Sequence, residues 1–330
     1  MKAVFWGYRF SDMKESWRPQ AQWLAEALYE EGHEIVQHRS FVCALPHARP
    51  YDPALDNPCD LVIYNHADIS HLMGNIVKAG RTWFLKPTVP DEVHSTLDPL
   101  GFGPYSSIAY ERPDFENIHA DEIAAFFTQK VSRWITNRIT KWGSFDPAKE
   151  DIAAEDYYLV IGQCGGDETV TRHDFGSHFL KLEQVVRELV HIGDRPVIVK
   201  LHPYTDGKDA KNNDFSLSLK QKIEAISPKV RVFNGKTSVH DFINYARCVI
   251  LANSGAGFEA MMHHKPIIAW GFSEYHWVAY DLRHLADLTR ATKLDWFDAG
   301  RQDKFLYWYM ERYCFYDLPT AKRRVKELLQ

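Results

Sequence analysis

Residues 248–270, CVILANSGAGFEAMMHHKPIIAW, carry the pattern that decides the fold. The apolar run 248–252 has the length of a buried strand, 257–263 is a short helical stretch, and 266–270 is a second apolar strand. A strand, a helix and a strand in close succession form a crossover unit, which joins parallel strands of one sheet. This stretch therefore predicts an α/β fold.

The same alternation continues on both sides of this stretch. In the second half, we expect further strands at 157–161, 196–201 and 230–233, and helices at 181–192, 217–226 and 239–246. In the first half, we expect strands at 3–6, 34–38, 61–64 and 82–85, and helices at 18–31 and 120–141. The prolines between residues 87 and 104 predict a loop-rich connection there. Two such sheets in tandem predict two Rossmann-like domains that face a cleft.

The length of the chain also favours two domains. At 330 residues it exceeds one typical core and suits two domains of about 150 residues each. The polar segment 143–155 is the expected linker. We therefore expect domains at 1–150 and 151–330, with the alternative that the last helix packs back on the first domain.

The composition excludes several classes of protein. The net charge of −5 argues against nucleic-acid binding. The five cysteines include no CxxC pair, so we expect no disulfide framework or zinc site and a reducing cytoplasm. The chain begins directly with a strand-like segment and has no apolar run of roughly 18 residues, so we expect neither a signal peptide nor a membrane span.

Candidate chemistry follows the ends of the predicted strands, because ligands bind beyond the carboxyl ends of open parallel sheets. The first such loop contains Gln163 and Asp167 among glycines that allow a close approach of the backbone. The Asp167 carboxylate could act as a general base or as a nucleophile toward an anomeric carbon. It could equally be a turn residue that bonds its own backbone.

The second loop contains His202 between Lys200 and Pro203. The proline fixes the turn and would hold the imidazole in place, and the two basic side chains suit a phosphate. The alternative interpretation is a histidine that only caps a turn.

The third loop, Ser254 and Gly255 followed by Gly257 and Glu259, opens a helix. The free N–H groups of a helix start suit a phosphate, and Glu259 could accept bonds from ribose hydroxyls. The alternative is an ordinary serine N-cap with a supporting glutamate. Metal binding has weaker support, because the sequence contains neither a P-loop nor an HExxH motif, and we found no acidic pair after a strand. The adjacent pair His263-His264 would point in different directions on a helix.

Three motifs resemble one known family, the retaining β-Kdo transferases of bacterial capsule and O-antigen assembly (the KpsC, KpsS and WbbB group). They are GQxxxD at 162–167, KLHP at 200–203 and SxxGFEA at 254–260, the last followed by Lys265-Pro266 and by Tyr275. Residues 84–86 and 100–106 show a weaker similarity to the same family. The likeness spans about residues 80–280.

The resemblance implies a GT-B fold, a CMP-Kdo donor and no catalytic metal or other cofactor. It implies that Asp167 is the nucleophile, with Gln163 beside it, and that donor-binding residues lie on the two later loops. These residues are Lys200, His202, Pro203, Ser254, Gly255, Gly257, Glu259 and Tyr275. Arg9, Lys86 and Ser106 are expected on the acceptor or sugar side, with Lys86 in place of the family's arginine.

Other functions remain open at this point. The chain could be a GT-B transferase or epimerase that uses CDP-glycerol or a UDP-sugar, or a non-catalytic sugar-binding subunit. The expected partners are a nucleotide-sugar donor and a saccharide or lipid-linked saccharide acceptor. Basic residues between 322 and 326 accompany apolar ones on a final helix. This helix could touch the anionic inner membrane from the cytoplasm, or it could pack back on the protein.

Overall fold

The computed structural model describes residues 1–7, 18–41, 43–65, 79–141, 143–144, 152, 156–165, 167–171, 178–203, 215–235 and 237–330. These residues form two compact units, which interleave along the chain. The first unit contains Met1–Pro113, Thr140–Gly143 and Tyr307–Gln330, and the second contains Asp114–Ile139 and Ser144–Leu306. This grouping differs from a division at residue 150 for three segments, 114–139, 144–150 and 307–330.

The first unit is built on a six-stranded sheet with the order β3-β2-β1-β4-β5-β6. Its strands are β1 (Lys2–Gly7), β2 (Glu34–Gln37), β3 (Arg49–Pro50), β4 (Cys59–Asn65), β5 (Ala79–Pro87) and β6 (Ser95–Asp98). Its helices are α1 (Arg18–Glu30), α2 (Pro53–Asp56), the 3-10 turn η3 (Gly103–Tyr105), α3 (Ser107–Tyr110), the π-helical η7 (Tyr309–Tyr313) and α14 (Leu318–Leu329). All neighbouring strands are parallel except β5 and β6.

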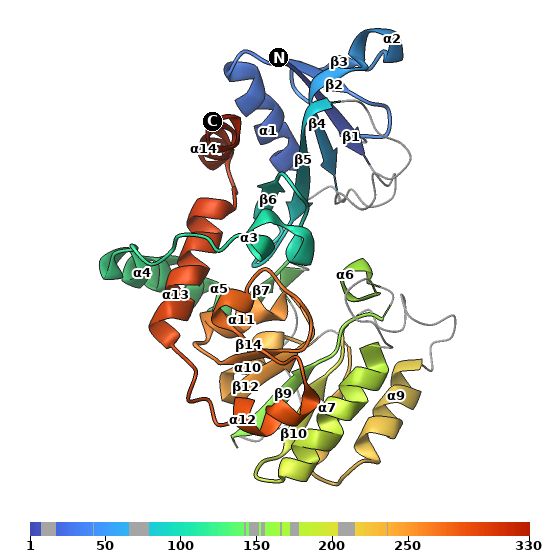
Figure 1. Cartoon of the computed structure of the whole chain (residues 1–330), viewed down its shortest axis with the longest axis vertical. Coiled ribbons are helices and arrows are strands. Elements are labelled where there is room, and N and C mark those ends of the chain that lie inside the picture. Colours follow the sequence, from blue (N-terminus) through green and yellow to red (C-terminus); the bar gives the residue numbers. More distant parts are fainter. Residues whose placement is uncertain are drawn as a thin grey trace. The chain divides into compact units, whose positions relative to one another are not determined.

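One face of this sheet carries the larger core of the first unit. Alternate residues of the strands, such as Phe5, Ile63 and Leu85, pack against apolar residues of α1 and against Ala321 and Val325 of α14. Helices α1 and α14 lie side by side in Figure 1 and contact each other. The last helix therefore packs back on the N-terminal sheet, which was the alternative left open by the sequence.

The second unit has the equivalent strand order, β11-β10-β9-β12-β13-β14. Its strands are β9 (Tyr157–Ile161), β10 (Val197–Lys200), β11 (Val230–Phe233), β12 (Ala246–Leu251), β13 (Ile267–Ala269) and β14 (Tyr280–Asp281). All are parallel. Its helices are α4 (Ala120–Phe126), η4 (Phe127–Val131), α5 (Ser132–Thr136), α6 (Glu168–Thr171), α7 (His178–Ile192), α9 (Phe215–Glu224), α10 (Val239–Tyr245), α11 (Ala256–Met262), η5 (His276–Val278), η6 (Leu285–Asp287), α12 (Leu288–Ala291) and α13 (Ala299–Trp308).

Helices cover both faces of this second sheet. Leu182 and Val186 of α7, with residues of α9 and α12, pack on one face. On the other face, Phe242 of α10 packs against Phe233 of β11. Figure 1 shows α7 and α9 running alongside β9 and β10. Because both faces are covered, the strands are continuous apolar runs in the sequence. This is why the strand bounds expected from the sequence lie close to the observed ones.

Two expectations about secondary structure need correction. The region expected to be a loop-rich connection contains strand β6, whose four residues are buried and pair antiparallel with β5. The helix expected at 120–141 ends at Thr136, and its middle turn is the π-helix η4. It ends there because Arg138 adopts a positive φ of 53°, which an α-helix cannot contain.

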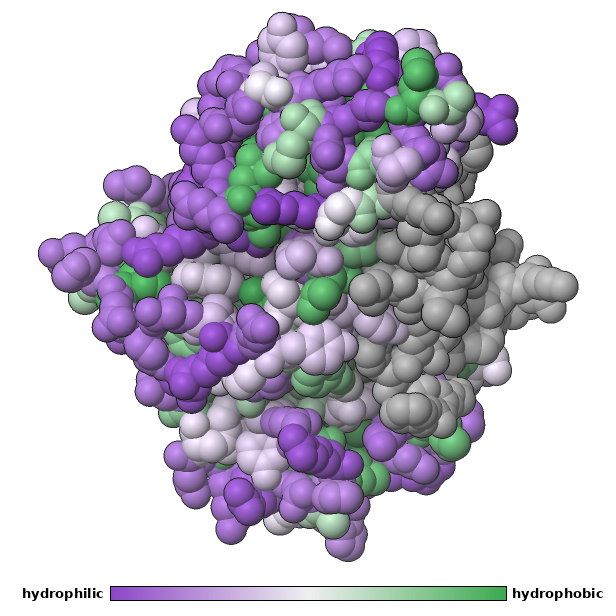
Figure 2. All heavy atoms as spheres, turned by 45° about the horizontal axis from the view of Figure 1, so that its top comes forward, coloured by the Kyte–Doolittle hydropathy of each residue, from purple (hydrophilic) through white to green (hydrophobic). Residues whose placement is uncertain are grey.

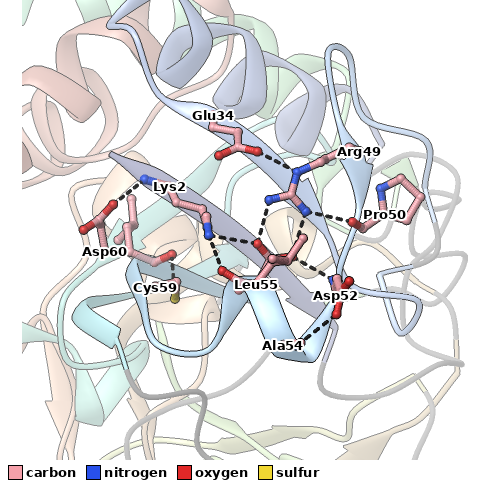
Figure 3. Close-up of polar contacts among 11 residues, drawn as sticks. Lys2, Glu34, Arg49, Pro50, Asp52, Ala54, Leu55, Cys59 and Asp60 are labelled. Atoms are coloured by element: carbon pink, nitrogen blue, oxygen red, sulfur yellow. Dashed lines mark hydrogen bonds and ion pairs between the residues drawn. The ribbon is translucent and has the colours of Figure 1, made fainter.

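A network of ion pairs around the buried Asp56 carboxylate lies at the amino-terminal edge of the first sheet. The Asp56 carboxylate accepts two bonds from the Arg49 guanidinium, at 2.7 and 2.6 Å, and lies 3.1 Å from Lys2 Nζ. Arg49 also bonds Glu34, and the Lys2 backbone N–H bonds Asp60 (Figure 3). These contacts connect the starts of β1, β2, β3 and β4, so the network determines how these strands begin.

Candidate functional site

The candidate site lies where the strand order of the second sheet reverses, between β9 and β12. Gln163 follows β9 and Asn253 follows β12, and their side chains make a reciprocal pair. Gln163 Nε2 donates to Asn253 Oδ1 at 3.0 Å, and the Asn253 backbone N–H donates to Gln163 Oε1 at 3.0 Å. Ligands of doubly wound sheets bind at this reversal point. The pair therefore holds together the two loops between which a ligand would enter.

Asn253 also connects these loops to two further segments. Its Nδ2 donates to the Thr169 carbonyl at 2.7 Å and to the Phe272 carbonyl at 3.3 Å. Thr169 belongs to α6 and Phe272 follows β13. The sequence analysis gave Asn253 no role, although an amide side chain directly after a buried strand was a usable signal.

The Asp167 carboxylate stands at the start of α6 and makes local bonds. Its Oδ1 accepts from the Thr169 backbone N–H at 3.0 Å and from the Thr169 hydroxyl at 2.8 Å. This is the capping arrangement that was one of the two interpretations of Asp167. The side chain is half-buried at the end of the strand-end loop. Thr169 thus fixes the orientation of the carboxylate.

His178 is a second neighbour of this loop that sequence reasoning missed. Its Nε2 accepts a bond from the Gln163 backbone N–H at 2.9 Å. Burial lowers the pKa of His178 to about 4, while the negative charge of Asp167 acts in the opposite direction. The imidazole is therefore neutral near pH 7, and its proton is on Nδ1 because Nε2 is an acceptor. A lone histidine at the start of a helix gave no signal in the sequence.

Lys200 and His202 lie at the end of β10, and the structure gives them different surroundings. Lys200 is only 4% exposed, and its ammonium donates to the carbonyls of Leu201 at 3.0 Å and Gly235 at 2.9 Å. It holds the chain after β10 against the chain after β11. His202 is half-buried, and its Nδ1 lies 3.2 Å from the Cys164 sulfur. Pro203 follows it, also half-buried.

Ser254 and Gly255 precede α11 and shape its start. The Ser254 hydroxyl accepts from the Ala256 backbone N–H at 3.2 Å, and Gly255 is the N-cap residue. The Ser254 carbonyl accepts from the Tyr275 hydroxyl at 2.7 Å. Ser254 therefore precedes the cap of α11 instead of being the N-cap itself, and its contacts tie the start of α11 to the segment after β13.

The Tyr275 ring packs directly against Gly257. A Cβ atom at Gly257 would lie 2.6 Å from Cζ of the Tyr275 ring, so only glycine fits there. The ring is buried, and burial raises the pKa of Tyr275 well above its ordinary value. The negative charges of Glu274 and Glu259 act in the same direction. Glu259 itself is 4% exposed, so its carboxylate lies inside the unit near Tyr275.

One known protein family matches mainly the second unit of the chain. The family model described as capsule polysaccharide biosynthesis protein matches residues 116–316, which is well over half of the sequence. The chain belongs to this family. The match covers nearly all of the second unit, including the loops after β9, β10 and β12. No curated protein matches the sequence.

Two solved structures have the same fold as this capsule biosynthesis family member. The first is Thermosulfurimonas dismutans KpsC, beta Kdo 2,4 transferase, with a TM-score of 0.61 and 14% identity, covering 98% of this chain and 94% of that one. The second is the beta Kdo 2,7 transferase of the same KpsC, with a TM-score of 0.53 and 13% identity, covering 100% and 99%. The predicted GT-B type fold is thereby confirmed, as is the resemblance on which it was based.

The first unit of this family member holds the remaining predicted residues. Arg9 lies outside the described residues. Lys86 on β5 places its ammonium 4.3 Å from the centre of the Phe102 ring, a cation–π distance. Ser106 is buried, and its hydroxyl donates to the Gly103 carbonyl at 2.7 Å. It shapes the turn before α3 and lies away from solvent.

That turn is organised by Asp98, which the sequence analysis did not single out. The buried carboxylate accepts bonds from the backbone N–H groups of Leu100 and Gly101, from the Ser107 hydroxyl and from the Tyr313 hydroxyl. The residues that weakly echo the family motif at 100–106 thus surround a structural carboxylate.

The basic residues of α14 bond to their own unit. Lys322 pairs with Glu30 at 2.6 Å, and Lys326 pairs with Glu31 at 3.3 Å. Arg324 donates to the Leu97 carbonyl. These are the contacts expected of a helix that packs back on the protein.

The described residues contain neither a candidate metal site nor a helix that could span a membrane. No group of three or more His, Cys, Asp or Glu side chains in this part of the chain is placed to hold a metal ion. None of the helices that the structure describes has the length and apolar character needed to cross a bilayer. On the face drawn in Figure 2, hydrophobic residues form small groups among hydrophilic ones.

Proposed function

We propose that this chain is a glycosyltransferase that moves a Kdo-type sugar from CMP-Kdo to a saccharide acceptor in capsule or related surface polysaccharide synthesis. The observation that carries the proposal is the network at the reversal point of the second sheet. There Gln163 and Asn253 bind each other beside Asp167. Family membership and the fold shared with two proteins named as β-Kdo transferases support the choice of reaction.

In this proposal the second unit binds the donor. The start of α11 after Ser254 and Gly255, with His202, faces the CMP phosphate, because N–H groups and imidazole stabilise an anion. Glu259 accepts hydrogen bonds from the ribose hydroxyls. Gly257 and Tyr275 fix the position of α11, and Lys200 and Pro203 fix the chain that carries His202. Arg9, Lys86 and Ser106 support the sugar or acceptor side.

Asp167 is the proposed nucleophile of a retaining, double-displacement reaction. Thr169 orients the carboxylate through its bonds to Oδ1. A bond forms between an oxygen of the Asp167 carboxylate and the anomeric carbon, while the bond from that carbon to the phosphate oxygen breaks and CMP leaves with the electron pair. An acceptor hydroxyl then attacks the same carbon and gives its proton to water, while the bond from that carbon to Asp167 breaks and leaves the carboxylate. Two inversions give net retention.

The proposed reaction requires no metal. The CMP group is a good leaving group, and the anomeric carbon of Kdo already bears a carboxylate, so positioning and stabilisation of the phosphate charge carry the catalysis. The prediction is checked by measuring transfer with and without a chelator. An activity lost with the chelator and restored by a divalent ion would contradict it.

Incubation of the protein with freshly prepared CMP-Kdo tests both donor and mechanism. We expect intact-protein mass spectrometry to detect one added Kdo residue, and peptide mapping to locate it on Asp167. CDP-glycerol and UDP-sugars serve as comparison donors. Turnover with one of these and none with CMP-Kdo would replace the donor assignment, and binding without any turnover would indicate a non-catalytic subunit.

The variant Asp167→Asn tests the role of Asp167 as the nucleophile most directly. Asparagine caps a helix as well as aspartate does, so α6 keeps its start while the nucleophile is lost. We expect transfer to fall on the order of 10³-fold or more, with the CMP dissociation constant within about 3-fold of the parent. Thr169→Val is the matched control, because it removes one bond to Oδ1 and leaves the carboxylate. Equal transfer by the asparagine variant and the parent would remove Asp167 from the mechanism.

A further inference from the structure

Cys164 and His202 form a pair that none of the roles above uses. Cys164 follows β9 and His202 follows β10, which is the neighbouring strand of the sheet. The cysteine sulfur lies 3.2 Å from Nδ1 of the imidazole, within hydrogen-bond distance for sulfur. The thiol is 2% exposed, so this contact lies in the interior beneath the loop surface.

The chemistry of the two groups indicates the direction of the bond. A thiol carries one proton, and its sulfur is a weak acceptor, whereas an unprotonated imidazole nitrogen is a good acceptor. The favourable arrangement is therefore donation from the Cys164 S–H to His202 Nδ1. A neutral imidazole that accepts at Nδ1 carries its own proton at Nε2.

We propose that Cys164 is a positioning residue that holds His202 in the Nε2–H tautomer, so that the imidazole offers an N–H donor to the donor phosphate. The identity of the ligand rests on the function proposed above, but the tautomer does not. The preceding residue acts in the opposite sense on another histidine, because the Gln163 N–H donates to His178 Nε2. Consecutive residues of one loop thus fix two histidines in opposite tautomers.

CMP binding tests the consequence of this contact. Loss of a hydrogen bond worth about 0.5–1.5 kcal/mol corresponds to roughly 3- to 10-fold in affinity, so we expect Cys164→Ala to weaken CMP binding by that factor. Cys164→Ser, which keeps an O–H donor, should bind within about 2-fold of the parent. A serine variant as weak as the alanine variant, or an alanine variant equal to the parent, would overturn the proposal.

His202→Gln provides the matched background, because the glutamine amide supplies an N–H near the position of Nε2 without needing Cys164. In that background Cys164→Ala should cause no further loss of CMP affinity, since positioning acts through the imidazole. An equal loss in both backgrounds would indicate that the thiol only supports the packing of the loop, and the proposal would fail.

Nitrogen NMR of the ¹⁵N-histidine-labelled full chain reads the tautomer without any ligand. We expect a protonated Nε2 and an unprotonated Nδ1 for His202, whose signals are assigned by their disappearance in His202→Gln. The opposite tautomer would overturn the inference. If this tautomer is observed and CMP does not bind, the donor assignment fails while the positioning role stands.

Discussion

Each sheet has a polar network at one end of its strands. The network of the first sheet is built from charged side chains, whereas the network of the second sheet is built from neutral amides. At the amino-terminal edge of the first sheet, Asp56 is bound by Arg49 and Lys2 as a fully buried carboxylate. At the carboxyl-terminal edge of the second sheet, Gln163 and Asn253 are neutral amides that bind each other and the neighbouring carbonyls. The strand order around both is the same.

The difference follows from what each edge must do. Ion pairs that are fully matched hold a fixed structure and leave no charge for a ligand. Neutral amides order the loops around a site without adding a net charge, so other groups at the site can bind the charge of a phosphate. We therefore expect damage to the first network to affect stability and damage to the second to affect binding.

The largest effect is expected for Asp56→Asn. Breaking a buried ion pair typically costs 3–5 kcal/mol, and because Arg49 is partly exposed we expect a loss of about 2–3 kcal/mol in the free energy of unfolding. Urea denaturation measures this loss, and CMP affinity should stay unchanged. Asp60→Asn is the matched control, since Asp60 is exposed and accepts a bond from the Lys2 backbone N–H. A loss of CMP affinity in Asp56→Asn would break the comparison.

Asn253→Asp should show the opposite pattern. The new carboxylate oxygen would face the Thr169 and Phe272 carbonyls where an N–H₂ group now donates. We expect CMP affinity to fall by about 10-fold, or about 1.4 kcal/mol, because the carboxylate oxygen loses both bonds and is repelled by the two carbonyl oxygens. Calorimetric titration with CMP measures the change. Gln163→Glu is the paired variant at the other half of the contact. Unchanged CMP affinity in both would show that this edge does not order the site.

The pH dependence of stability sharpens the comparison further. The Arg49 guanidinium holds the pKa of Asp56 far below its usual range. The unfolded chain takes up a proton near the ordinary pKa of about 4, whereas the folded one does so only at much lower pH. The stabilisation is therefore present above about pH 4 and declines as the pH falls below it.

Accordingly, the difference in unfolding free energy between the parent and Asp56→Asn should shrink on acidification from about pH 7 to about pH 3. Urea unfolding across this range checks the sign. A difference that stays constant would mean that Asp56 does not titrate differently in the folded and unfolded chains.

The smallest effect is expected for Lys326→Ala on α14. Its ion pair with Glu31 is solvent-exposed, and such pairs contribute about 0–1 kcal/mol. We expect a loss of less than about 0.5 kcal/mol in unfolding free energy and no change in binding to anionic vesicles. Co-sedimentation with vesicles is the second measurement. Clear vesicle binding that Lys326→Ala weakens would favour the membrane interpretation of this helix.

The local sequence determined the positions of several strands and of the loops that follow them. The strands at 157–161 and 230–233 were located to the residue, because buried parallel strands read as short apolar runs between polar turns. The three loops after β9, β10 and β12 were found for the same reason. The local backbone bond expected of Asp167 at the start of α6 is present, whereas the N-cap residue of α11 is Gly255 and not Ser254.

The tertiary structure alone decided which side chains meet. Gln163 and Asn253 are 90 positions apart, and Cys164 and His202 are 38 apart, so only the order of the strands brings them together. The antiparallel β6 and the burial of Lys200 and Ser106 also depend on neighbours distant in sequence. Periodicity reports whether a segment is buried, but the partner of each strand-end side chain is determined by long-range pairing, which no local pattern encodes.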